Sequence, residues 1–121
     1  MIRAPLGWPT QVPPPTVDGW LDGATNWLLD QLPGEYRQYE VARRHPILLS
    51  RLALLQVRAE ITSVRLLLGR VRVDLKGLLT PTATNSAIEM LEQRLAALAA
   101  LEREVTLLGD AIELNAHSHL T

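Results

Sequence analysis

Four arginines near the middle of the chain stand one heptad apart: Arg51, Arg58, Arg65 and Arg72. On an α-helix this spacing places them in one row along the surface, called here the arginine row. Arginine pairs bidentately with phosphate, so the row could form a nucleic-acid contact. The alternative is a row of charges that flanks a helix seam and meets acidic residues of another helix. The net charge of −1, with no aromatic residue between the arginines, favours this alternative.

Metal binding is the second chemistry to consider. Glu113 and His117 stand four residues apart and His119 follows, so on a helix they could share a metal ion. A di-metal bundle needs a Glu-x-x-His motif, which this sequence lacks. Because these residues lie near the end of the last predicted helix, we expect a solvated tail there. No metal or other cofactor is predicted.

No residue receives a catalytic role. His45 precedes Pro46 and could act as a pH-responsive hinge, but a structural role at a helix end is expected. Ser50, Ser63 and Ser86 have no histidine and acid nearby in a recognisable arrangement. The absence of cysteine excludes thiolate catalysis and disulfides. The sequence therefore predicts a non-enzymatic protein.

The composition predicts an all-α fold. The chain has 121 residues, the length of one domain, and 47% of them are hydrophobic although Phe is absent. A leucine-rich core of this kind suits helix packing better than a β-sandwich. No apolar run approaches the roughly 18 residues of a membrane span, and the N-terminus lacks the apolar region of a signal peptide. We therefore expect a soluble, cytoplasmic protein.

The first 45 residues are expected to form an arm and two short helices. Residues 1–16 hold five of the eight prolines, which predicts an extended arm, and its Trp8 is a candidate partner contact. Helices are predicted at 17–32, capped by Thr16 or Asp18, and at 35–44. Trp20 and Trp27, one heptad apart on the first of these helices, are expected in the core.

Residues 46–79 are predicted to form a long helix, because apolar residues alternate at spacings of three and four. One part of this segment, 69–77, alternates polar and apolar residues between two glycines and could instead be a strand. Helix is favoured because the heptad continues through it and no partner strand is evident. The predicted seam residues are Leu54, Val57, Ile61, Val64, Leu68, Val71, Leu75 and Leu78.

A loop at 80–85, with Pro81 as a helix stop, is predicted to precede a last helix at 86–115 and a flexible tail at 116–121. So short a loop makes the two long helices antiparallel neighbours. The first carries a charge of +4 and the second −4, which favours their pairing. The seam residues of the last helix are Leu91, Leu98, Leu101, Val105, Leu108 and Ile112.

The 46–79 helix also carries a second apolar stripe that a single neighbour cannot cover. Leaving it open would expose a large apolar patch, so we expect a homodimer with a four-helix-bundle-like core. The sequence thus predicts a helical oligomerisation or protein-interaction module, with a nucleic-acid-associated dimer that uses the arginine row as the alternative. The second stripe consists of Leu48, Leu52, Leu55, Ala59, Leu66 and Val73.

Overall fold

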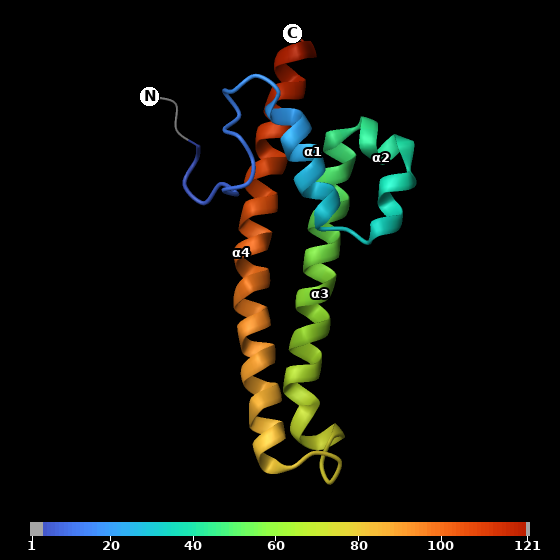
Figure 1. The fold of residues 1–121 in the computed structure, drawn as a ribbon, viewed down its shortest axis with the longest axis vertical. Coiled ribbons are helices and arrows are strands. Elements are labelled where there is room, and N and C mark those ends of the chain that lie inside the picture. The colour runs from blue at the N-terminus through green and yellow to red at the C-terminus, as the bar shows by residue number, and fades with distance from the viewer. Residues whose placement is uncertain (1–3, 121) are drawn as a thin grey trace.

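Two long helices form an antiparallel hairpin that runs the length of the molecule (Figure 1). A computed structural model describes residues 4–120, with side chains through His117. The all-α class and the helical hairpin are confirmed, and no strand occurs in residues 4–120. The elements are α1 (Trp20–Asp30), η1 (Gly34–Gln38, a 3₁₀-helix), α2 (Glu40–Arg44), α3 (Pro46–Asp74) and α4 (Pro81–Leu120).

The interface between α3 and α4 is an apolar seam. Most of the heptad residues of both helices are buried in it: Val57, Ile61, Val71, Leu91, Leu98, Val105, Leu108 and Ile112. The others on these two helices are partly buried: Leu54, Val64, Leu68 and Leu101. The helices approach closely where Gly109 meets Ser50, because a Cβ added at Gly109 would lie 3.4 Å from the Ser50 hydroxyl.

The turn at the lower end of the hairpin differs from the prediction. α3 ends at Asp74, five residues earlier than predicted. In the turn that follows, Gly77 takes a left-handed conformation (φ 79°) and the Leu78 amide donates to the Leu75 carbonyl at 2.9 Å. Leu75 is partly buried there and Leu78 is 75% exposed, so Leu78 lies outside the seam. The alternative of a strand at 69–77 is wrong, since residues 69–74 are helical.

α4 begins five residues earlier than predicted. Pro81 is its first residue and does not act as a stop, because a proline in the first turn lacks only an amide that would have no helical partner. Thr80 caps the helix: its Oγ1 accepts a hydrogen bond from the Ala83 amide at 3.1 Å. At the other end α4 continues through Leu120, so residues 116–120 are helical where a flexible tail was predicted, and Thr121 lies outside the described residues.

The head of the molecule consists of residues 4–45 and the upper parts of α3 and α4 that they cover (Figure 1). α1 crosses the upper hairpin, and η1 and α2 stand beside α3 on the side away from α4. α1 is shorter than predicted, because neither Thr16 nor Asp18 caps it and its N-cap is Gly19 in the left-handed conformation. The predicted helix at 35–44 is divided into η1 and α2 at Tyr39, which is extended.

The N-terminal arm folds back on the head and is not extended over its described residues. Trp8 and Val12 are buried, and the Trp8 indole Nε1–H donates to the Val12 carbonyl at 3.0 Å. The ring of Trp8 lies 6.1 Å from that of Trp20, which is buried together with Trp27 in the head core. Because the indole packs inward, Trp8 holds the arm in place and is not displayed as an exposed partner contact.

Replacing Trp8 by Ala should destabilise the protein by about 3 kcal/mol, since a buried aromatic side chain and its hydrogen bond are lost. Urea unfolding followed by circular dichroism measures the change. Leu6→Ala is the matched control in the same arm, because Leu6 is 100% exposed and its truncation should leave the midpoint unchanged. Equal effects of the two substitutions would contradict the packing of the arm.

Two glycines near the turn should respond in opposite directions to alanine. Within the single chain, Gly69→Ala should stabilise the fold by about 0.5–1 kcal/mol, because Gly69 is within α3 and a Cβ there meets nothing within 4 Å. Gly77→Ala should destabilise it by about 1–2 kcal/mol, because Gly77 has a positive φ. Thermal unfolding of the two variants checks both signs, and a stabilising Gly77→Ala would mean that the turn does not need its left-handed residue.

Candidate functional site

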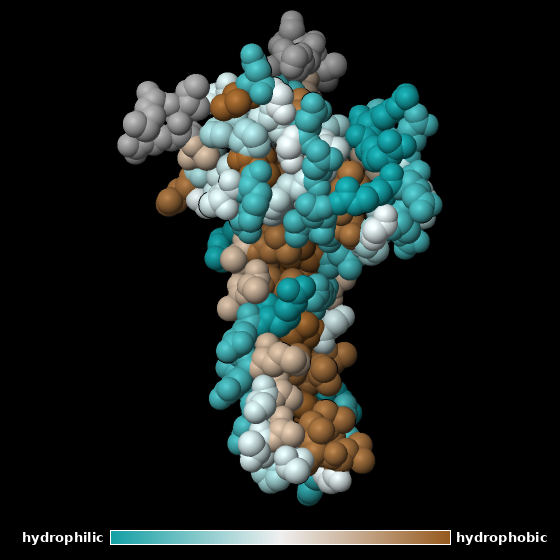
Figure 2. All heavy atoms as spheres, in the orientation of Figure 1, coloured by the Kyte–Doolittle hydropathy of each residue, from teal (hydrophilic) through white to brown (hydrophobic). Residues whose placement is uncertain are grey.

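The lower part of the hairpin, called here the stalk, is covered by no other element of the described chain. It consists of residues 55–74 of α3, the turn at 75–80 and residues 81–100 of α4. Figure 2 shows apolar surface gathered on the stalk, chiefly on the α3 side, below a more polar head. The exposed large apolar side chains of the stalk are Leu55, Leu66, Leu67, Val73, Leu78, Leu79 and Met90.

One face of α3 presents a continuous strip with the spacing 4-3-4-3-4, called here the outer strip: Leu55, Ala59, Thr62, Leu66, Gly69 and Val73. Each of these residues is two positions from a seam residue, which on an α-helix is the opposite side. The strip therefore faces away from α4. Leu55, Leu66 and Val73 are 65%, 66% and 73% exposed.

The outer strip contains most of the second stripe predicted from the sequence, and two residues that the prediction missed. Thr62 and Gly69 complete the spacing, but neither is apolar enough to be found by a search for large hydrophobic residues. At the upper end of the second stripe, Leu52 packs partly against the head core and Leu48 remains 38% exposed. The head thus shields only part of the upper end.

Two polar groups on and beside the outer strip, the Thr62 hydroxyl and the Arg70 guanidinium, already have partners within the chain. The Thr62 hydroxyl donates to the Arg58 carbonyl at 3.1 Å. Arg70, which borders the strip, donates two hydrogen bonds to Asp74, both 3.1 Å long. These bonds raise the pKa of Arg70 above its ordinary value. Covering the strip on this side would therefore leave neither the Thr62 hydroxyl nor the Arg70 guanidinium without a partner.

The arginine row divides into an upper and a lower half. Arg51 pairs with Glu113 at 3.3 Å and Arg58 with Glu102 at 2.9 Å, both across the seam to α4. Arg65 and Arg72 are exposed and make no ion pair within the described part of the chain. Half of the row is therefore a seam-flanking set of charges, as the alternative interpretation expects, and only two arginines remain for any other contact.

At the opposite edge of the seam the charges are exchanged, so that the arginine belongs to α4 and the carboxylate to α3. Arg94 of α4 donates to both carboxylate oxygens of Glu60 on α3, at 2.7 and 2.8 Å. These cross-seam pairs agree with the opposite charges predicted for the two helices. Nearer the head, burial raises the pKa of Glu104 and the neighbouring Arg103 opposes that rise.

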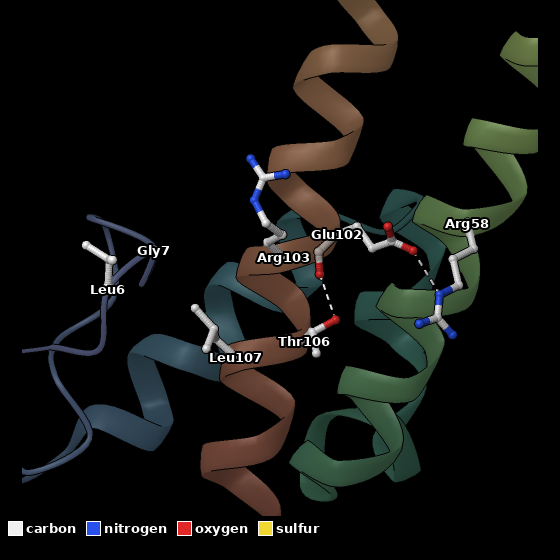
Figure 3. Close-up of a pocket in the computed structure, with 7 residues that line it drawn as sticks. All are labelled: Leu6, Gly7, Arg58, Glu102, Arg103, Thr106 and Leu107. Carbon is white, nitrogen blue, oxygen red and sulfur yellow. Dashed lines mark hydrogen bonds and ion pairs between the residues drawn. The ribbon is translucent and has the colours of Figure 1, made fainter.

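A surface cavity of about 590 Å³ lies between the arm and the edge of α3, and α4 forms its floor (Figure 3). Two of its polar side chains already have partners: Arg58 binds Glu102, and the Thr106 hydroxyl donates to the Glu102 carbonyl at 2.8 Å. Leu6, which forms its outer wall, is fully exposed. We find here no enclosed volume and no unpartnered nucleophile, so the cavity does not resemble an active site.

The remaining chemical candidates have structural roles or stand alone. Ser50 is buried and its hydroxyl donates to the Ile47 carbonyl at 2.8 Å, while Ser63 and Ser86 are exposed. His45 is exposed and makes no side-chain cap at the junction of α2 and α3. Glu113 lies 4.0 Å from His117, and the side chain of His119 is outside the described ones. No cluster of three metal-ligating residues occurs in the described part of the chain.

Comparison with known proteins adds no further information on the site: no family model, no curated protein and no solved structure matches this chain. Within residues 4–120, no helix combines the length and the hydropathy needed to cross a lipid bilayer. The candidate site is therefore defined by the physical properties of the outer strip alone.

Arg58→Gln should lower the free energy of unfolding by about 0.2–1 kcal/mol, because it breaks a cross-seam ion pair on the surface. Arg65→Gln, one heptad below, should leave it unchanged, because Arg65 has no such pair. Urea titration at low and high salt measures both, and the Arg58 effect should shrink as salt screens the pair. A larger loss for Arg65→Gln would show that Arg65 binds a carboxylate in solution.

Proposed function

We propose that this chain is a non-enzymatic interaction module that forms a homodimer through the outer strip of α3. The observation that supports the proposal is the exposure of Leu55, Leu66 and Val73 on one face of a helix whose other face is already paired. Monomers rarely leave a contiguous apolar face open to water. Pairing two such faces would bring the two α3 helices into contact, with the α4 helix of each copy on the outer side of its own α3.

The expected gain in free energy is comparable to the cost of association. Burying these three side chains in each of two copies should contribute roughly 6–12 kcal/mol, given about 1.5–3 kcal/mol for a fully buried side chain and their present exposure. Association costs about 4–15 kcal/mol in lost freedom of motion. We therefore expect a dimer that dissociates on dilution.

A cytoplasmic location is part of the proposal, since the sequence contains no cysteine.

Nucleic-acid binding is the weaker alternative. Its support is limited to Arg65 and Arg72, because Arg51 and Arg58 are paired with carboxylates of α4. A chain of net charge −1 has no general attraction for phosphate. We therefore do not propose it as the function.

Light scattering coupled to size-exclusion chromatography tests the proposal. The wild-type chain should have twice its mass of 13.4 kDa at high concentration and approach 13.4 kDa on dilution. Leu66→Glu should be monomeric throughout, because it places a charge at the centre of the strip. Circular dichroism should show that it remains helical, since Leu66 is 66% exposed and outside the seam.

Met90→Glu is the matched control. Met90 is also exposed on the stalk but belongs to α4, so this variant should keep the wild-type mass. A wild-type chain that is monomeric at every concentration would refute the proposal. A dimer that Leu66→Glu leaves intact would also refute it, because association would then use another surface.

A further inference from the structure

We propose that the two copies pair antiparallel, α3 against α3, about a two-fold axis that passes beside residue 64. In this arrangement residue i of one copy lies opposite residue 128 − i of the other. This inference rests on the proposed function, because it specifies how the outer strip would be occupied. The occupant is a second copy of this chain.

The first argument is the symmetry of the outer strip. A two-fold interface uses the same surface on both copies, so that surface must be complementary to itself. The strip has the same spacing read in either direction, with its centre between Thr62 and Leu66. Antiparallel pairing places Leu55 opposite Val73 of the second copy, and Thr62 opposite Leu66. Over 18 residues the contact is roughly 27 Å long, at ~1.5 Å per residue.

The second argument is the distribution of side-chain size along the strip. Ala59 and Gly69 are opposite each other in this register, so the two backbones can approach closely on both sides of the axis. A Cβ at Gly69 would meet nothing within 4 Å in the single chain, so no contact of its own chain requires this glycine. A helix–helix contact does use such a small residue, because it lets the partner helix come near.

The third argument is the position of the head. η1 and α2 stand beside the upper part of α3 on the side away from α4, which is the side of the outer strip (Figure 1). Two copies placed in the same direction would bring these elements into collision at the same level. Reversing one copy puts the heads at opposite ends, where each stalk tip reaches toward the partner's head.

The charges bordering the strip fit one side of this pairing and oppose the other. Gln56, Ser63 and Arg70 form one heptad row, so Arg70 lies between Gln56 and Ser63 of the second copy, both uncharged. On the other side the two arginine rows run past each other, and Arg65 and Arg72 of the two copies repel. Association should therefore strengthen from low to moderate salt, since the Debye length falls to about 10 Å at 0.1 M.

Disulfide trapping tests the orientation, because the chain has no cysteine of its own. Leu55→Cys and Val73→Cys are made as separate variants and oxidised alone and mixed. Antiparallel pairing predicts a covalent dimer only in the mixture, since like positions are about 27 Å apart and a disulfide needs Cα atoms within about 7 Å. Glu89→Cys on α4 is the control and should form no covalent dimer with either variant.

The mass of each variant is also measured by light scattering, so that failure of the antiparallel orientation can be distinguished from failure of self-association. Covalent dimers of each variant alone would mean parallel pairing and overturn the inference. A non-covalent dimer without any trapped product would overturn it as well, while leaving self-association intact. A monomer at every concentration would overturn the proposed function itself.

Discussion

The apolar seam between α3 and α4 is the constraint on which the rest of this structure depends. It fixes the antiparallel direction of the helices and brings Arg58 beside Glu102 and Glu60 beside Arg94 along its two edges. These surface pairs are weak individually, so they set the register of the hairpin more than they stabilise it. The seam also decides what remains outside: any apolar residue two positions from it faces away from α4.

The two ends of the hairpin meet this constraint in different ways. At the upper end the arm, α1, η1 and α2 cover the hairpin and build a core around Trp8, Trp20 and Trp27. At the lower end no described element does so, and leucine, valine and methionine side chains stay in contact with water. The described elements other than the hairpin therefore all lie at one end, and the proposed homodimer would cover the other.

The sequence predicted the all-α hairpin because periodicity over many residues depends on the average of many side chains. It failed where one residue decides the geometry. The heptad runs through Leu75 and Leu78 without a break, yet α3 ends at Asp74 and the left-handed Gly77 turns the chain between these two leucines. Pro81 suggests a helix stop from the sequence, but proline also suits a first turn, and Thr80 provides the cap. The fold of the arm depends on contacts between Trp8 and Trp20, which no local pattern encodes.

The candidate site was predicted in outline only. Large apolar residues outside the seam indicated the second stripe. Thr62 and Gly69 are not large apolar residues, so only their position on the same face of α3 shows that they belong to the outer strip. The division of the arginine row was also hidden, because equal spacing says nothing about which carboxylates of α4 lie within reach. Which ion pairs form between α3 and α4 depends on the register of one helix against the other. The residue pattern of a single helix does not specify that register.

All of the ultraviolet fluorophores of this protein lie in the head. The three tryptophans and both tyrosines fall between residues 8 and 39, and the chain has no phenylalanine. Intrinsic fluorescence therefore reports on the head alone, whereas the far-ultraviolet circular dichroism is dominated by the two long helices. The pair of signals separates the two ends of one small protein without any label. Their melting curves coincide only if the head and the stalk unfold as a single cooperative unit.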